Sequence, residues 1–233
     1  MIPTLALPEI LKSFRLQDVT DDPGKLSAAF DIVVDGYSGL SSRSLDAREV
    51  RETVCNDDYH RQGLARTLLL SGWNPETARV EPLGTLRLTL GSTDAERLGL
   101  RPLEAMNLMT FPQGWANFHF EGFEVNQVVE GGRTAVSIGC RTGAGKEMGL
   151  PGFVLRALTV GGFRIATQKY GKSQLWAILP SYMVRRLKAV GIQAIVAPHV
   201  VLQLQKQPQV FRDYDRYWLH SDPAFCKVLV PAA

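Results

Sequence analysis

The sequence is poor in cysteine and lacks long apolar stretches. Its three cysteines, Cys55, Cys140 and Cys226, are widely separated and odd in number, and no Cys/His spacing fits a zinc site. We therefore expect no metal centre and no disulfide framework, and reduced thiols of this kind are typical of the cytoplasm. No apolar run reaches the roughly 18 residues of a membrane span, and the N-terminal residues lack the pattern of a secretion signal. The prediction is a cytoplasmic protein without a transmembrane segment.

Strong charge of one sign is also missing. The sequence holds 26 Lys and Arg against 23 Asp and Glu, a net charge of +3, and no run of five basic residues occurs. Nucleic acid is therefore not an expected partner, whereas an acidic protein partner is compatible with this balance. With 233 residues, 45% of them hydrophobic, the chain is long enough for one well-buried core. We expect a single domain over residues 1–233, with an aromatic tail over 206–233 that covers a sheet edge or an opening.

Helix and strand patterns alternate along the chain. This order predicts a mixed α/β fold, in which a central mixed β-sheet carries helices on both faces. Hydrophobic periodicity, with breaks at glycine and proline, predicts helices over 25–34, 152–170 and 180–189, strands over 64–70, 82–90, 118–129 and 173–179, and a long β-rich run over 192–204. The run 64–70 also fits a buried helical turn. Because glycine weakens strands, Glu130-Gly131-Gly132 is expected to end the strand over 118–129.

Two of the predicted strands carry a single charge in apolar surroundings. Arg87 interrupts the strand over 82–90, and Glu124 interrupts the strand over 118–129. A buried strand has little reason to carry a charge unless that charge has a partner or a task. Two interpretations are open: Arg87 and Glu124 pair with each other, or they belong to a site between the strands.

Three short motifs connect the chain with a known family. Asp57-x-Tyr59, Gly84-x-x-Arg87 and Glu124 follow one another in an order that resembles the autoinducer-synthase branch of the GNAT acyltransferase superfamily. This branch includes acyl-homoserine-lactone synthases and long-chain N-acyl amino acid synthases, and the chain is more similar to the latter. The resemblance spans residues 25–205 and implies a GNAT-like fold. It also implies an N-acyltransferase that moves a fatty acyl chain from acyl carrier protein to the amine of an amino acid.

The chain departs from the family pattern at three positions. His60 stands where a second acid is usual, and Asn126 and Gln127 replace a Ser-Arg pair. These departures concern the binding of the amine more than the transfer of the acyl group.

The resemblance implies roles for individual residues. Glu124 is expected to be the general base, because an ammonium must lose a proton before its nitrogen attacks and burial raises the pKa of a carboxylate toward neutrality. Arg87 is expected to bind the substrate carboxylate bidentately, with Asp57 and Gln127 in the same substrate site. Other roles remain open: Arg87 in a structural ion pair, Asp57 in a loop or a helix cap, and His60 as an alternative base or a packed residue.

The implied donor is an acyl-phosphopantetheine thioester, carried by acyl carrier protein or by coenzyme A, with no covalently bound cofactor. Backbone N–H groups near 125–128, on a splayed strand, are expected to hold the oxyanion. The glycine-rich segment 141–146 either offers N–H groups to a phosphopantetheine arm or is a plain connection. An acidic carrier protein requires a basic face. The candidates for that face, which are also compatible with ordinary solvated helix surfaces, are Arg156, Lys169, Lys172 and Arg185.

Two further functions remain open. The first is an acyl-homoserine-lactone synthase, which uses S-adenosylmethionine and releases a lactone. The second is a non-catalytic GNAT-like binding module, in which Arg87 and Glu124 merely pair. A long acyl chain would also need an apolar tunnel, and the candidate linings, which are equally compatible with an ordinary core, are Phe118, Phe120, Phe153 and Trp176.

Overall fold

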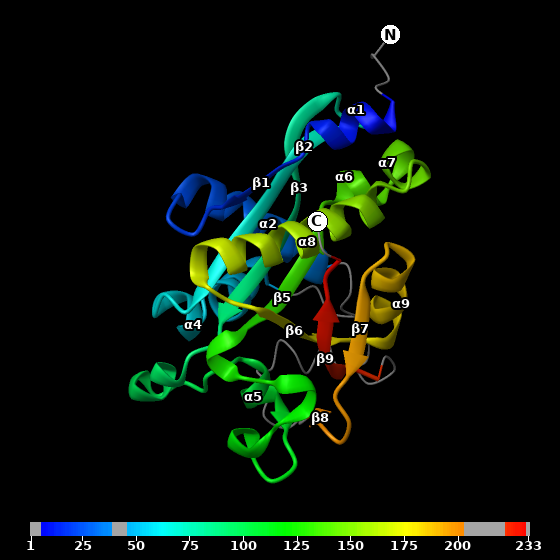
Figure 1. Ribbon diagram of the computed structural model, residues 1–233. Helices are drawn as coiled ribbons and strands as arrows, with labels where there is room; N and C mark the ends of the chain where they lie inside the picture. Colours follow the sequence, from blue (N-terminus) through cyan, green and yellow to red (C-terminus); the bar gives the residue numbers. More distant parts are fainter. Residues whose placement is uncertain (1–5, 39–45, 203–221, 232–233) are drawn as a thin grey trace.

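A seven-stranded mixed sheet forms the centre of the computed structural model, which describes residues 6–38, 46–202 and 222–231 (Figure 1). Neighbouring strands are antiparallel except β5 and β6, which run parallel. The strand order is β1 (Arg15–Asp18), β2 (Ala65–Asn74), β3 (Arg79–Leu90), β5 (Val128–Val136), β6 (Gln174–Leu179), β9 (Ala224–Leu229) and β7 (Gln193–Val196).

One long helix covers each face of this sheet. The helix α8 (Leu150–Tyr170) crosses β3 on one face, and α2 (Pro23–Ser38) packs against β3 and β5 on the other (Figure 1). Gly162 permits the close approach of α8, because a Cβ atom there would lie only 2.6 Å from Cδ2 of Leu86. The predicted mixed α/β fold, with helices on both faces of a central sheet, is therefore confirmed.

The predicted helix boundaries follow from local signals. The Asp22 carboxylate accepts the backbone N–H of Lys25 at 3.1 Å and so caps the start of α2. Gly171 follows α8 in a left-handed conformation with φ of 66°, as expected for a glycine that ends a helix. Pro180 precedes α9 (Ser181–Ala189), in agreement with the predicted helix over 180–189.

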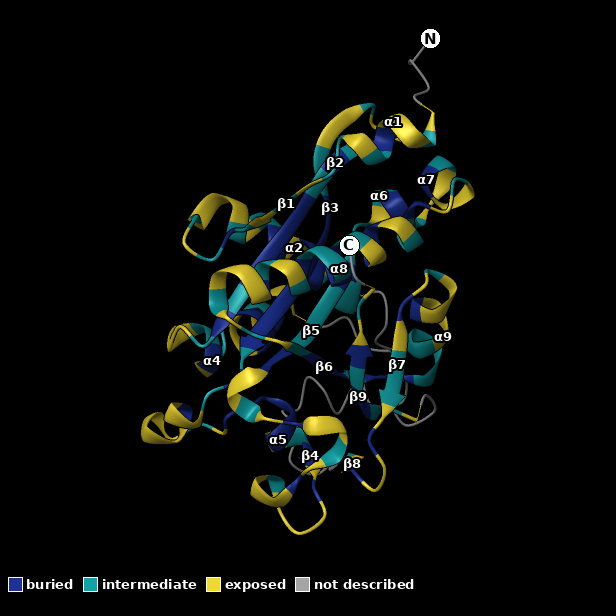
Figure 2. Ribbon diagram, viewed as in Figure 1, coloured by how far each residue is buried: buried dark blue, intermediate teal, exposed yellow. Residues whose placement is uncertain are grey.

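Side chains alternate across β3 as the pleat requires. Leu86 and Leu88 belong to the core beneath α8, whereas Arg87 points to the opposite face, toward the segment around Val54. Figure 2 shows β2 and β3 largely buried between the two helical layers. The charge of Arg87 is therefore enclosed between the two helical layers.

Short elements surround the sheet. They are α1 (Leu7–Lys12), α3 (Ala47–Val50), the π-helical η1 (Arg51–Cys55), α4 (Asp58–Arg61), the 3-10 turn η2 (Thr93–Leu98), α5 (Ala105–Leu108), α6 (Ile138–Arg141), α7 (Gly143–Glu147), and the two-stranded pair β4 (Met109–Thr110) and β8 (Val201–Leu202).

Within the part of the chain that the structure describes, no helix is both long enough and apolar enough to cross a bilayer.

The strand predicted over 118–129 is wrong. Two short 3-10 turns, η4 (Phe120–Gly122) and η5 (Val125–Gln127), occupy this stretch, and a positive φ at Glu121 and at Gly122 breaks any extended run. The aromatic side chains of the segment leave the sheet and pack around Trp176, whose ring stacks on Phe225 at 4.9 Å. The strand β5 begins only at Val128 and runs through the Glu-Gly-Gly sequence that was expected to end it.

The end of the chain also differs from the prediction. Of the β-rich run over 192–204, the described residues 192–202 contain two short strands, β7 and β8, because His199 turns the chain with a φ of 62°. The strand β9 lies inside the sheet, between β6 and β7, so residues 224–229 form part of the core structure. Residues 206–221 and 232–233 of the expected tail lie outside the described residues, and its covering role stays a prediction.

Candidate active site

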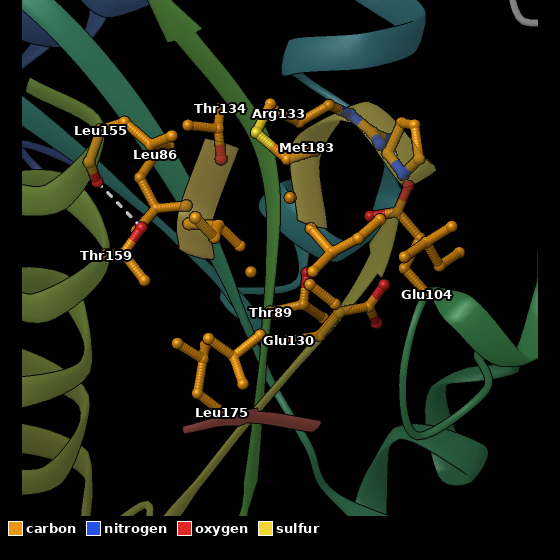
Figure 3. A pocket seen from close by; sticks show the side chains of 18 of the residues that line it. Leu86, Thr89, Glu104, Glu130, Arg133, Thr134, Leu155, Thr159, Leu175 and Met183 are labelled. Atoms are coloured by element: carbon orange, nitrogen blue, oxygen red, sulfur yellow. Dashed lines mark hydrogen bonds and ion pairs between the residues drawn. The ribbon is translucent and has the colours of Figure 1, made fainter. Parts of the chain in front are cut away.

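The strands β5 and β6 separate after a short parallel ladder. Their pairing ends at Gly131 and Ala177, although β5 continues to Val136 and β6 to Leu179. Beyond this point β6 pairs with β9 alone. The separation opens a cleft through the sheet, and residues on both faces line it (Figure 3).

The cleft has a polar end and an apolar end. Its volume is about 160 Å³. Figure 3 shows Leu155, Leu86 and Leu175 on one side of β5 and Glu104 and Arg133 on the other. The polar end is lined by Tyr37, Thr89, Glu104, Glu130 and Arg133, and the apolar end by Leu86, Leu155, Leu175, Ala177, Leu179, Met183, Leu187 and Val228, with Thr134 and Thr159 beside its leucines. A molecule with a charged or polar group and a hydrocarbon part fits such an arrangement.

Glu130 is a buried carboxyl group where the two ends meet. It stands between Thr89 of β3 and Trp176 of β6 in the sheet register, and only 5% of it is exposed. Its Oε2 atom accepts the backbone N–H of Ala105 at 3.0 Å. Burial and the nearby Glu104 carboxylate raise the pKa of Glu130 to about 8, against the opposing effect of that hydrogen bond and of two arginines. A carboxyl group of this kind can exchange a proton near neutral pH.

A β-bulge in β5 aims Arg133 into the polar end. Arg133 and Thr134 stand opposite the single residue Leu86 of β3, and Arg133 has a left-handed φ of 49°. A non-glycine residue with this φ is uncommon and costs free energy, so the surrounding contacts must hold it. The guanidinium of Arg133 pairs with the Glu104 carboxylate, and its Nε–H donates to the Val54 carbonyl at 3.1 Å.

A second ion pair lies behind the first. The Arg87 guanidinium donates from both Nη atoms to the Asp57 carboxylate, at 2.6 and 2.7 Å, and is almost fully buried. Its Nη2 also lies 3.7 Å from Glu104, and the Arg133 guanidinium lies 3.6 Å from Asp57. The two pairs therefore form one connected network of buried charges, in which each interaction affects the others.

Asp57 has two structural tasks in this network. It caps α4 by accepting the backbone N–H of His60 at 3.1 Å while it holds Arg87. Neither Asp57 nor Arg87 lines the cleft. The position of these two residues therefore does not support their expected contact with substrate. In the structure Asp57 caps a helix and Arg87 forms an ion pair, which are the two alternative roles that the sequence left open.

Tyr59 fixes the loop that carries the Glu130 donor. Its hydroxyl contacts the carbonyl oxygens of Arg101 and Leu103 at 3.0 and 3.2 Å and accepts the side-chain amide of Asn107 at 2.7 Å. Burial raises the Tyr59 pKa far above neutrality, so this hydroxyl stays protonated. Ala105 lies within this fixed loop, so its N–H is held in place for Glu130.

Glu124 is not where the sequence prediction placed it. It is exposed in the turn that precedes β5, and it does not line the cleft. The predicted buried position was wrong because the aromatic segment around it folds into turns and not into a strand. Arg87 pairs with Asp57, so the alternative in which Arg87 and Glu124 pair is wrong as well. Gln127 is also exposed, with its side-chain oxygen bonded to the Ser173 hydroxyl at 3.1 Å.

The predicted docking residues do not form one surface. Lys172 donates to the carbonyls of Gly91 and Asn126, at 2.7 and 2.8 Å, and Lys169 pairs with Asp18 at 3.0 Å near the end of α8. Arg156 lies at the other end of α8, about 20 Å away at 1.5 Å per residue, and donates to the carbonyl of Val190. Arg185 is exposed on α9, whose inner side lines the cleft.

The glycine-rich segment 141–146 folds into parts of α6 and α7. The Glu76 carboxylate accepts the backbone N–H of Ala144, so an acid already occupies the start of α7. The candidate tunnel aromatics do not line the cleft either: Phe118, Phe120 and Trp176 form a separate apolar cluster, and Phe153 is exposed. Their ordinary role as core residues accounts for the first three.

The cysteines and the candidate metal ligands have no catalytic arrangement in the described residues. All three thiols are buried, and burial raises the pKa of Cys55 to about 11 and that of Cys226 to about 12, so neither is a thiolate at neutral pH. No group of three or more His, Cys, Asp or Glu in residues 6–38, 46–202 and 222–231 could hold a metal ion. His60 is half-buried beside Phe30, and burial lowers its pKa.

Sequence reasoning missed Glu104, Glu130 and Arg133. One signal for Glu130 was present, since the acid follows two valines and precedes two glycines that leave room beside it. Arg133 and Glu104 carried no comparable signal, because the bulge and a long loop bring them together.

No protein-family model and no curated protein matches the chain. Its structure is similar to that of FeeM, an N-acyl amino acid synthase from uncultured soil microbes, with 15% sequence identity over 93% of this chain and 89% of that chain and a TM-score of 0.47. It is similar to an aminoglycoside N-acetyltransferase, with 13% identity over 94% and 96% of the two chains and a TM-score of 0.45. It is also similar to the CoA-dependent acyl-homoserine lactone synthase BjaI, with 16% identity over 88% of each chain and a TM-score of 0.42.

Proposed function

We propose that this protein is an N-acyltransferase, which moves an acyl group from a thioester to an amine within the cleft between β5 and β6. The observation that carries the proposal is the position of Glu130. This buried carboxyl group, with a pKa near neutrality, lies where a polar end and an apolar end of one cleft meet.

Glu130 supplies the base that amide formation requires. An ammonium has no lone pair, so the Glu130 carboxylate first takes one of its protons. The free nitrogen then attacks the thioester carbonyl, forms the C–N bond and gives a tetrahedral oxyanion. When the C–S bond breaks, the thiolate leaves and takes up the proton that Glu130 holds, while the nitrogen loses its remaining extra proton to water. The products are an amide and a free thiol.

The separated edge of β5 supports this chemistry. Beyond Gly131 this edge has no strand partner on the β6 side among the described residues. Backbone N–H groups of the stretch 132–134 that face the cleft are suited to hold the oxyanion. The sequence prediction placed this function at 125–128, but residues 125–127 lie in a turn and Val128 lies in the part of β5 that is still paired with β6.

The apolar end suits the hydrocarbon part of the donor. Leucines of α8 and β6 and the flexible side chain of Met183 line it. The thiols are protonated and buried, so the acyl group passes directly from donor to amine without an acyl-enzyme.

The helix α9 is the best-placed docking surface for the donor. Its inner residues Met183 and Leu187 line the cleft, while Arg185, Arg186 and Lys188 are exposed on its outer side. Acyl carrier protein and coenzyme A both present negative charge next to the same phosphopantetheine arm, and a basic surface beside the cleft would attract either.

A matched pair of acid-to-amide variants tests the function. Purified protein is given acyl-coenzyme A or acyl carrier protein thioesters and a panel of amines, and thiol release and amide products are measured. Glu130→Gln is expected to lower kcat by about 100-fold or more, the usual contribution of a general base. Glu124→Gln, which changes an exposed acid six residues away, is expected to leave kcat unchanged. Equal activity of Glu130→Gln and the unaltered protein would refute the proposal.

The donor is distinguished with charge reversals. Arg185→Glu is expected to raise the KM for acyl carrier protein at least about fivefold, with Lys169→Glu at the far end of α8 as the control. A carrier-protein KM that is the same in all three proteins, together with turnover of acyl-coenzyme A, would identify coenzyme A as the donor.

A further inference from the structure

The polar end of the cleft restricts which amine can bind there. This inference rests on the proposed acyl transfer and concerns its acceptor. From the pairing of the two buried arginines we infer that the acceptor is a cationic amine that carries no carboxylate beside its nitrogen, and not an α-amino acid.

Arg87 cannot act as the carboxylate-binding group that the sequence suggested. Both of its Nη atoms already donate to the two oxygens of Asp57, the bidentate geometry that a substrate carboxylate would need. Arg87 is 3% exposed and does not line the cleft. An amino acid could reach it only by removing Asp57, which would also uncap α4.

Arg133 is the single cationic side chain among the cleft-lining residues that the structure describes. Its guanidinium pairs with Glu104 and lies 3.6 Å from Asp57, and its Nε–H donates to the Val54 carbonyl. A substrate carboxylate at Arg133 would displace Glu104 and leave that acid buried without its partner, which is strongly unfavourable.

The remaining charges at the polar end favour a cation. Three carboxylates, Asp57, Glu104 and Glu130, face two guanidiniums, so ionisation of Glu130 leaves the network with an excess negative charge. Two of these acids, Glu104 and Glu130, line the cleft. An ammonium near Glu130 neutralises this excess, whereas a carboxylate on the same small molecule would be placed against the two acids.

Matched acceptors that differ only by the carboxylate test the inference. Leucine is compared with isoamylamine, and tyrosine with tyramine, using the whole 233-residue chain and one acyl thioester donor, with amide products quantified by mass spectrometry. The amine of each pair is expected to have a kcat/KM at least about tenfold above that of its amino acid. An amino acid acylated as well as its amine overturns the inference and leaves acyl transfer standing. No amide product from any acceptor overturns both.

A variant of Glu104 tests the physical reason. Glu104→Gln removes the acid that holds Arg133 and is expected to move the preference toward the amino acid of each pair, lowering the amine-to-acid ratio at least about fivefold. Glu104→Asp keeps the charge and is expected to keep the preference for the amine. An unchanged ratio in a folded Glu104→Gln protein counts against the inference, and if this variant does not fold, the comparison of acceptors with the unaltered protein decides.

Discussion

The backbone N–H of Ala105 donates a hydrogen bond of 3.0 Å to the carboxyl group of Glu130. This contact joins a loop held by Tyr59 to the strand at which the cleft opens. It fixes the direction of the carboxyl group without neutralising the effect of burial, which still raises the Glu130 pKa to about 8. The position and the proton affinity of one side chain are thus set by two separate parts of the chain.

The pH dependence of turnover follows from this pKa. Glu130 accepts a proton only when ionised, so kcat/KM is expected to rise with pH through an inflection near 8. The acceptor binds as an ammonium, so its deprotonation in solution lowers kcat/KM again near pH 10. In Glu130→Gln the rise near 8 should be absent. An inflection near 8 in both proteins would assign it to another group.

The stability of the protein should depend on Glu130 in the same pH range. Its pKa in the folded protein, about 8, is above the ordinary value of 4.5. The stabilising effect of the bound proton is therefore complete below pH 4.5 and is lost as pH rises to 8. Glu130→Gln does not have this loss of stability. The free energy of unfolding of Glu130→Gln minus that of the unaltered protein should therefore increase by roughly 2–4 kcal/mol as the pH is raised from 5 to 9. Urea unfolding measures it, and Glu124→Gln should show no such trend.

A side chain added at Gly132 should close the cleft without unfolding the protein. Gly132 lines the cleft, its backbone φ is not in the left-handed region, and a Cβ there meets no atom within 4 Å. Gly132→Val is expected to lower kcat/KM at least about tenfold while the free energy of unfolding changes by less than about 1 kcal/mol.

Gly84→Ala is the contrasting control. A Cβ at Gly84 would lie 2.7 Å from Val154, so this variant should lose about 1–3 kcal/mol of stability through overpacking and keep its turnover once folded. Full activity of Gly132→Val would show that substrates do not use this part of the cleft.

The buried pair of Asp57 and Arg87 should behave as a unit. Asp57→Asn and Arg87→Met each remove the bidentate partner of an enclosed charge, so each should lower the free energy of unfolding by about 3–5 kcal/mol. The double variant should lose less than the sum. Asp58→Asn, which breaks the exposed pair with Arg61 in the same short helix, should cost less than about 1 kcal/mol. Additive losses in urea unfolding would contradict the coupling.

Local patterns were sufficient for the helices and for β3. The apolar spacing of α8, its final glycine and the Asp22 cap are signals that act within a few residues, so the sequence predicts them well. The charge of Arg87 in an apolar strand also indicated correctly that a buried partner exists. Its identity was not predictable, because Asp57 lies thirty residues away and reaches Arg87 only through the fold.

The start of β5 could not be predicted from the sequence, because tertiary packing determines the structure of the segment before it. Phe118, Phe120 and Phe123 have high strand propensity, but they gain more by packing on Trp176 and Phe225 than by extending the sheet. The two glycines after Glu130 suggested a strand end, whereas in the fold they leave space beside the separated strands. Because the strand was predicted about ten residues too early in the chain, Glu124 and not Glu130 was expected to be the base.

The insertion of β9 between β6 and β7 has a consequence for how the protein reaches this structure. The strands β6 and β7 follow each other along the chain with only α9 between them, yet the edge of β6 away from β5 and the inner edge of β7 pair only with a segment about 45 residues after β6. Until β9 arrives, two open edges are available to other chains. Refolding yield should therefore fall with protein concentration, and the wall of the cleft is completed last.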